Sequence, residues 1–406
     1  MKRLLTGIAQ MATPPGPGPR RGAAMSEVQI IQHAAMVIEA GRIVWVGRKD
    51  EWSGTADEVI DLGGRAVLSG LIDPHTHAMW GGDRLADFEA RCAGATYEQI
   101  LAAGGGIWHT IRSTACLSCE ELAERALPNL EALVRSGATT IEIKSGYGYS
   151  PEAELRMLEA IQRLQRNTTA HLVPTLLIHI CPEDKVERAH YSEAVCKELI
   201  PEAARRGLAV AVDVFVEKHS WSAEEAKVIL GCARSHGLPV KLHTEQFHSI
   251  GGLELGLELG ALSIDHLEAC TPAQYASIAA SPTIATILPG VTLHLGLPAA
   301  PGRALIDAGA AVAIGTDLNP GSSPLFSTAA AMALATRLNG LSAAEALTAS
   351  TVNAAAALGL AEGGWLGVGQ PADFIVIDSN DWRDLPYALG TNIVSEVWIG
   401  GERLPA

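Results

Sequence analysis

The chain has 406 residues, of which 48% are hydrophobic and 18% charged, so it can bury a large core and is neither disordered nor collagen-like. Its net charge is −15, whereas nucleic-acid-binding proteins typically carry an excess of basic residues. No apolar run reaches the roughly 18 residues that a membrane span needs. We therefore expect a cytoplasmic globular protein without nucleic-acid or membrane partners, and its seven cysteines, which form no disulfide framework, agree with a reducing compartment.

Short segments rich in Val and Ile, separated by Gly and Pro, predict β-strands at both ends of the chain. They lie between residue 4 and about residue 61, and again in PADFIVIDSN and SEVWIGGERL near the other end. Helical periodicity is absent between residues 4 and 61. We therefore predict that residues 1–65 and 366–406 build one small domain together, which brackets a larger domain of residues 66–365.

The middle of the chain alternates short apolar runs with stretches of helical period, a pattern typical of a parallel sheet covered by helices. Eight such units predict an α/β fold, the (β/α)8 barrel, in which reactive side chains gather at the carboxyl ends of the strands. The predicted strands are residues 67–73, 139–145, 170–178, 209–217, 239–243, 261–266, 283–289 and 311–317.

Histidines and other polar residues finish these strands. His75 and His77 form an H-x-H pair, and alternate residues of an extended segment point the same way, so both imidazoles can reach one ion. With His243 and Asp317 they form a set of three nitrogens and one carboxylate, which suits zinc and also iron. A bound divalent ion lowers the pKa of its water toward neutrality, so hydrolysis is the predicted chemistry. The remaining strand ends carry Lys144 with Tyr147, His179, Glu217 and His266.

Several segments resemble a known family. GLIDPHTH, the isolated His243 and His266, and the GTD of the last strand resemble the amidohydrolase superfamily. WGGDRLADFEAR, GATYEQILAAGGGI, EIKSGYG, the HTEQ run, ALSIDHLE, ILPG and TDLNPGSSP are similar to the imidazolonepropionase family, over nearly the whole chain. The resemblance implies a TIM-like barrel with a small β-sandwich domain from both termini. It also implies a metal-bound hydroxide that attacks the cyclic amide of 4-imidazolone-5-propanoate and opens the ring to N-formimidoyl-L-glutamate in histidine degradation.

The resemblance further implies roles for individual residues. It makes His75, His77, His243 and Asp317 the ligands of one zinc or iron ion per subunit, divalent or trivalent. It also implies that Asp317 takes the proton from the metal-bound water. Because His266 ends the sixth predicted strand, we expect it to polarise the attacked carbonyl or to transfer a proton. We expect a homodimer that acts on a small anionic molecule. The residues implied in substrate binding are Arg84, through the propionate, Tyr147, His179, Gln246, Asn319, Gly321 and Ser322.

Alternatives to this activity stay open. Another cyclic-amide hydrolase or an aromatic deaminase of the superfamily would share the metal motif, but deaminases commonly place a Glu three residues after the third histidine, where this chain has Gln246. A metal-binding relative without catalysis would also keep the ligands. Some superfamily relatives have a carbamylated lysine that bridges two metals, and Lys144 ends a strand as such a lysine would. The resemblance implies one metal, so we expect a structural or substrate-adjacent role for Lys144. His294 replaces an aromatic residue common in the family, and Gly104–Gly106 indicates a loop that can act as a lid.

Overall fold

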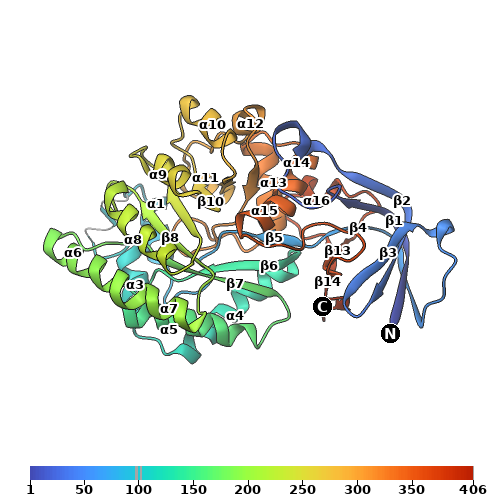
Figure 1. Cartoon of the computed structure of the whole chain (residues 1–406), viewed down its shortest axis with the longest axis horizontal. Coiled ribbons are helices and arrows are strands. Elements are labelled where there is room, and N and C mark those ends of the chain that lie inside the picture. The colour runs from blue at the N-terminus through green and yellow to red at the C-terminus, as the bar shows by residue number, and fades with distance from the viewer. Residues whose placement is uncertain (97–98, 101–102, 406) are drawn as a thin grey trace.

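The computed structural model describes residues 1–96, 99–100 and 103–405. Their strands form two sheets, and helices surround the larger one (Figure 1). The larger sheet has eight parallel strands in the order β12-β11-β10-β9-β8-β7-β6-β5, and the smaller has seven in the order β15-β14-β13-β4-β1-β2-β3. The predicted (β/α)8 barrel with a second part built from both termini is therefore confirmed, and that part, expected as a small β-sandwich, is a mixed sheet of seven strands.

The barrel has a strand at each of the eight predicted positions, although only the second part of the first predicted strand belongs to it. Its first and last strands meet beyond their ends, where Thr76 and Leu318 form a parallel bridge. The Asp317 amide donates to the carbonyl of His75 at 2.9 Å, and the His77 amide donates to the carbonyl of Leu318 at 2.9 Å. These contacts close the barrel at the residues proposed as metal ligands. The strands are β5 (Leu71–Asp73), β6 (Ala138–Lys144), β7 (His171–Ile178), β8 (Ala211–Val216), β9 (Val240–Thr244), β10 (Ser263–His266), β11 (Ile284–Ile287) and β12 (Val312–Ile314).

Most of the helices that cover the barrel bury apolar residues on one side, as α5 does with Met157, Leu158 and Ile161. Several start at a capping box, in which a Ser and the Glu three residues later bond reciprocally to the backbone, as Ser118 and Glu121 do before α4. The helices that the structure describes are α1 (Leu85–Cys92), α3 (Ile107–Ala115), α4 (Cys119–Arg135), α5 (Pro151–Gln165), α6 (Lys185–Ala194), α7 (Ile200–Arg206), α8 (Ala223–Ser235), α9 (Gly252–Leu259), α10 (Pro272–Ala279), α11 (Pro289–Leu295), α12 (Gly302–Asp307), α13 (Thr328–Leu338), α14 (Ala343–Ala349), α15 (Val352–Ala357) and α16 (Asp384–Tyr387). The shorter turns are η1 (Gly22–Ser26), η2 (Lys49–Glu51) and the π-helical η3 (Val195–Leu199). None of the helices within the described residues is long and apolar enough to cross a membrane.

The small sheet joins the two ends of the chain, whose termini lie on the same side of the molecule in Figure 1. Only β1 and β4 pair in parallel, and the other pairs are antiparallel. β4 and β13 connect the N-terminal and C-terminal parts, with Ser69 opposite Phe374. The strands are β1 (Lys2–Thr13), β2 (Gln29–Glu39), β3 (Arg42–Arg48), β4 (Glu58–Ser69), β13 (Phe374–Ile377), β14 (Val394–Ile399) and β15 (Glu402–Arg403).

The first predicted barrel strand is divided between the two sheets. Residues up to Ser69 belong to β4 of the small sheet, and only Leu71–Asp73 pair with the barrel. Gly70 lies between them, and a Cβ there would approach the Thr139 Oγ1 to 2.4 Å. Glycine therefore lets the chain cross from one sheet into the other at close quarters. The domain division at residue 65 stays a prediction.

Candidate active site

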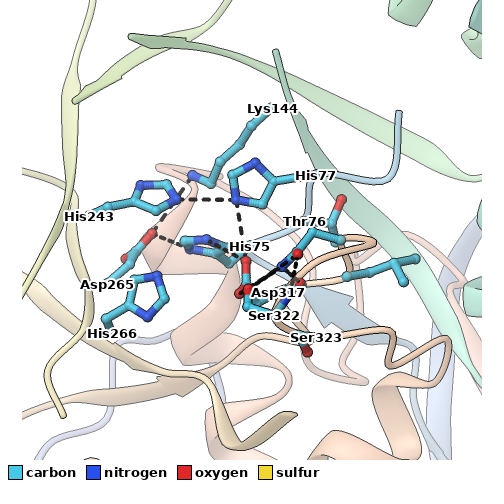
Figure 2. A network of polar contacts seen from close by, with 12 residues as sticks. His75, Thr76, His77, Lys144, His243, Asp265, His266, Asp317, Ser322 and Ser323 are labelled. Carbon is cyan, nitrogen blue, oxygen red and sulfur yellow. Dashed lines mark hydrogen bonds and ion pairs between the residues drawn. The ribbon is translucent and has the colours of Figure 1, made fainter. Parts of the chain in front are cut away.

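Four side chains proposed as metal ligands converge at the carboxyl ends of the barrel strands (Figure 2). The Nε2 atoms of His75 and His77 each lie 3.3 Å from Oδ1 of Asp317. The Nε2 of His243 lies 3.3 Å from the Nε2 of His77. All four residues are buried, with at most 3% of their surface exposed. The barrel thus gathers four donor atoms from β5, β9 and β12, which stand far apart in the sequence.

The chemistry of these donor atoms fits a cation among them. The Nε2 of His75 and the Oδ1 of Asp317 are buried, and neither has a hydrogen-bond partner among the residues that the structure describes. Burial, with the charges of His75 and Lys144, holds the pKa of His243 well below its usual range, which favours the neutral imidazole that binds metals. Burial acts to raise the pKa of Asp317, but its contacts with His75 and His77 hold it well below the usual range. Three imidazoles and one carboxylate suit zinc or iron.

The two oxygens of the Asp317 carboxylate have different partners. Oδ2 accepts a hydrogen bond from the side-chain amide of Asn319 at 3.0 Å and from the hydroxyl of Ser322 at 3.4 Å. The Asn319 oxygen in turn accepts from the amides of Gly321 and Ser322, both at 2.8 Å. Asp317 has a φ of 52°, a left-handed conformation that turns the chain sharply after β12. The loop therefore holds one oxygen and leaves Oδ1 facing the histidines.

A network of buried charges lies behind the ligands. The Nδ1 of His75 is 2.7 Å from Asp265 and that of His243 is 3.0 Å from Asp213, so both rings can present Nε2 to an ion. Lys144 contacts Asp213 at 2.7 Å, Glu142 at 2.8 Å and Asp265 at 3.8 Å, and Lys241 contacts Glu142 at 2.8 Å. These are fully buried ion pairs.

The network determines the charge state of Lys144. Burial acts to lower the pKa of Lys144, but Asp213 and Glu142 raise it above its usual value. Carbamylation needs the neutral amine, so the ion pairs oppose a second metal bridged by this lysine.

The same network acts on the pKa of His75. Burial and Lys144 act to lower this pKa, but Asp265 and Asp317 outweigh them and raise it to about 9.

Three further aromatic side chains predicted at the site lie against the ligands. The ring of His179 stacks on that of His77, with centroids 5.4 Å apart. Burial and His77 lower the pKa of His179 to about 3, so its imidazole is neutral. Tyr147 lies 5.9 Å from His77 between ring centroids, and burial raises the pKa of its phenol. His266 lies on the other side, 5.5 Å from the ring of His243.

Arg84 lies next to the loop after β12. Its Nε pairs with Asp87, whose carboxylate also accepts from the Gly106 amide at 2.9 Å. Its Nη1 lies 3.5 Å from the Thr110 hydroxyl, and a Cβ on Gly321 would lie 3.0 Å from the same Nη1. Because Asp87 binds at Nε, the edge formed by the two Nη atoms is available to a carboxylate. Glycine at position 321 makes room for this guanidinium.

The loop after β9 carries the predicted Gln246, which is 9% exposed. Glu217 of the preceding strand end holds this loop: it accepts from the amides of Phe247 at 3.0 Å and His248 at 3.1 Å, and from the His248 ring at 2.7 Å. Glu245 has a φ of 59°, so the chain turns directly after the strand, and its Oε1 accepts from the amide of Leu253 at 3.4 Å. Glu217 and Glu245 are therefore supports of the loop.

His294 and the glycines of residues 104–106 lie in the same region. His294 of α11 stacks on Phe88 of α1, with ring centroids 6.1 Å apart, and contacts Arg91. Gly106 precedes α3, and the Asp87 carboxylate that it contacts also holds Arg84. This connects the glycine segment to the predicted substrate-binding arginine. Its role as a lid stays a prediction.

Sequence reasoning missed the residues behind the ligands, namely Glu142, Asp213, Lys241 and Asp265. Their signal was present, because each is a charged residue next to a Val, Ile or Leu in a short predicted strand: TIEIK, AVDVFV, VKLHT and SIDH. A charge in such a strand must find a buried partner, since its desolvation costs several kcal/mol. Which charges pair could not be read without the barrel.

Comparisons with known proteins agree with this geometry. A model of the amidohydrolase family matches residues 66–404. The chain is 60% identical to the imidazolonepropionase of Deinococcus radiodurans and 58% identical to that of Deinococcus deserti, over 99% of both chains in each case. It is 43% identical to the imidazolonepropionase of Chloroflexus aggregans, over 97% of this chain and 96% of the other.

Solved structures with the same fold are more distant in sequence. Guanine deaminase of E. coli superposes with a TM-score of 0.74 at 16% identity, over 100% of this chain and 99% of that chain. An adenosine deaminase from Xanthomonas campestris with bound zinc gives a TM-score of 0.73 at 19% identity, over 99% and 92%. At such identities the likeness concerns the fold alone.

Proposed function

The chain belongs to the amidohydrolase family and, within it, to the imidazolonepropionases, hydrolases of histidine catabolism, and from this membership we propose how its residues open the imidazolone ring of 4-imidazolone-5-propanoate. The net reaction adds one water. The water oxygen forms a bond to the ring carbonyl carbon, the bond from that carbon to the ring nitrogen breaks, and a proton reaches the nitrogen. The product is N-formimidoyl-L-glutamate, in which the former carbonyl is a carboxylate.

His75, His77, His243 and Asp317 would hold one zinc or iron ion. When bound, such an ion lowers the pKa of a water molecule toward neutrality and polarises a carbonyl oxygen. Asp265 orients the ring of His75 by accepting from Nδ1, and a carboxylate oxygen of Asp213 lies 3.0 Å from Nδ1 of His243. Because Lys144 and Lys241 neutralise much of the carboxylate charge behind the ligands, these carboxylates stay fixed in the interior.

Substrate binding falls to side chains on either side of the ligands. Arg84 would take the propionate in a bidentate pair through its Nη edge, with Gly321 leaving space for the guanidinium. Tyr147 would donate its phenol proton, since the raised pKa keeps the phenol protonated. His179, neutral because of its lowered pKa, would bind a polar atom of the ring, and Gln246, Asn319 and Ser322 would supply further amide and hydroxyl contacts.

Proton transfer requires a group that accepts from water and one that serves the leaving nitrogen. Asp317 suits the first, because its Oδ1 faces the histidines while Asn319 and Ser322 of the loop hold Oδ2. His266 suits the second or would polarise the carbonyl, since one of its ring nitrogens lies within 4.8 Å of ligand atoms of His75 and Asp317. The observation that carries the proposal is this separation of the two Asp317 oxygens.

The experiment is turnover of synthetic imidazolonepropionate, followed by the loss of its ultraviolet absorbance. Asp317→Asn and His266→Ala are each compared with the wild-type protein at measured metal content. We expect both to lose activity, with His266→Ala retaining its metal. Wild-type turnover by metal-loaded His266→Ala would contradict the role of His266, and turnover by Asp317→Asn would contradict that of Asp317.

The same assay separates the alternatives. Gln246 at the position where the superfamily's deaminases commonly carry a proton-shuttling Glu disfavours deamination, because an amide does not titrate. Release of ammonia in place of ring opening would favour a deaminase. Full metal occupancy without turnover would favour a metal-binding relative. The metal itself is identified by elemental analysis, and the predicted homodimer by light scattering.

A further inference from the structure

Glu268 is a buried carboxylate whose charge finds no cationic side chain other than a histidine. Its side chain is 3% exposed, and neither oxygen has a hydrogen-bond partner among the described residues. Among the described residues, no lysine or arginine nitrogen lies within 4.0 Å of the Glu268 carboxylate, and the basic side chain at that distance is His266. A buried carboxylate is costly unless it is paired, so a position like this indicates a functional interaction.

The geometry brings Glu268 to one edge of the His266 ring. Oε2 lies 3.4 Å from Nδ1, and this nitrogen has no other partner in the described structure. The opposite side of the ring is directed toward the ligands, with the ring of His75 5.7 Å and that of His243 5.5 Å away between centroids. Figure 2 shows His266 beside His75 and Asp265. His266 therefore lies between Glu268 and the proposed metal centre.

The backbone is shaped to produce this pairing. His266 and Leu267 have φ values of 89° and 72°, so two consecutive residues with side chains occupy conformations that normally favour glycine. Two residues apart on a regular strand, His266 and Glu268 would point the same way without meeting edge to edge. Strain of this kind persists only where the surrounding structure enforces it, and it concentrates at functional sites.

Neighbouring backbone holds the strained turn. The amide of Ala269 donates to the carbonyl of Glu245 at 2.6 Å, and the amide of Leu267 donates to the carbonyl of Thr244 at 3.4 Å. Both acceptors belong to the segment that directly follows His243. The turn that carries Glu268 is thus fixed to the same segment as a proposed metal ligand.

We propose that Glu268 is a positioning residue for the ring-opening reaction: it accepts the Nδ1 proton of His266, which fixes the ring and its tautomer and leaves Nε2 for the substrate. A base oriented by a third group is a recurrent arrangement in hydrolases. The inference rests on the proposed role of His266 and adds the group that holds this histidine in the orientation and tautomer that its role needs. It assigns Glu268 no contact with substrate or metal.

The test is a double-mutant cycle of Glu268→Ala and His266→Ala, with kcat and KM measured at equal metal content. In the wild-type background we expect Glu268→Ala to lower kcat roughly 10- to 100-fold with little change in KM, because the ring loses its orientation. In the His266→Ala background the same substitution should have no further effect. Glu268→Gln keeps an oxygen that can accept from Nδ1 and should restore most of kcat.

A second readout follows the tautomer directly. In protein labelled with ¹⁵N-histidine, the His266 signal, assigned by its loss in His266→Ala, should report a protonated Nδ1 in the wild-type protein and in Glu268→Gln. In Glu268→Ala the signal should move toward the other tautomer. Glu345→Gln is the matched control, since Glu345 is also a buried carboxylate but pairs with Arg303 on the outer helices; it should lower thermal stability and leave kcat and the His266 signal unchanged.

The outcomes separate the two hypotheses. If His266→Ala retains wild-type activity, the role of His266 fails and the proposal for Glu268 fails with it. If His266→Ala is impaired but Glu268→Ala keeps kcat within twofold, only the proposal for Glu268 is overturned. An equal loss on removing Glu268 in both backgrounds would also overturn it, because Glu268 would then act on something other than His266.

Discussion

Removing the charge of Asp265 should weaken metal binding without unfolding the protein. Asp265 accepts from Nδ1 of His75 at 2.7 Å and lies 3.8 Å from each ammonium of Lys144 and Lys241. Asp265→Asn keeps the size of the side chain, but it removes a negative charge near the ion and weakens the contact that orients His75. Both effects lower metal affinity.

The magnitude follows from what each neighbour retains. Loss of a carboxylate behind a metal-binding histidine typically lowers metal affinity 10- to 100-fold, which is about 1.4–2.7 kcal/mol. The free energy of unfolding should fall less than for a fully broken buried pair, by about 1–3 kcal/mol. The reason is that Lys144 still contacts Glu142 and Asp213, and Lys241 still contacts Glu142.

The assay is competition for Zn²⁺ with a chromophoric chelator, using protein stripped of metal. Asp307→Asn serves as control, because Asp307 is an exposed carboxylate on α12 that pairs with Arg303. It should bind Zn²⁺ like the wild-type protein. Equal affinities of Asp265→Asn and wild type, within twofold, would refute the reasoning that Asp265 orients His75.

Three further predictions concern other parts of the molecule. Arg84→Lys should lower kcat/KM roughly 10- to 150-fold, mainly through KM, because the substrate loses a charged hydrogen bond worth about 1.5–3 kcal/mol. Steady-state kinetics measure this effect, and an unchanged KM would contradict the prediction. Asn319→Ala should lower kcat roughly 10- to 100-fold, because Oδ2 of Asp317 loses the hydrogen bond that the Asn319 amide donates at 3.0 Å. Steady-state kinetics at full metal occupancy test this prediction, and a wild-type kcat would speak against it. The contact with Asp373 raises the pKa of His171, so this pair stabilises the fold at pH values below about 6.5 and loses its effect as the pH rises through the raised value. His171→Gln should therefore reduce thermal stability at pH 5.5, by less than about 1 kcal/mol because the ring is half exposed, and leave it unchanged at pH 9; equal reductions at both would disprove this.

The sequence predicted the barrel because hydrophobic runs and strand-end polar residues are local signals. His75 and His77 are two residues apart, and the period of an extended strand suffices to bring them together. Asp317 and His243 required the further rule that parallel strands end at one rim. The same local signals could not locate Gly70, because the strand there changes sheets without a change in hydrophobic pattern.

Other features depend on contacts between distant residues and could not be predicted. The sequence shows only that Lys144 ends a strand. The structure shows three carboxylates around its ammonium group, which stabilise the positive charge in the interior. His294 gains its position from Phe88 and Arg91 of another helix. Glu268 follows His266 by two residues, but their edge-to-edge approach depends on two left-handed backbone conformations that no residue type there favours.

The pairing of β4 with β13 has a consequence for the order in which the protein is made. β4 leads through Gly70 into β5, and His75 follows two residues after β5, so the segment that carries the first proposed ligand is anchored to a strand near the end of the chain. During synthesis, which proceeds from the N-terminus, this anchor leaves the ribosome about 300 residues after His75. We expect that the nascent chain acquires a firmly held metal only once its last strands have been released. On this expectation, the topology of the small sheet places metal loading after the synthesis of β13.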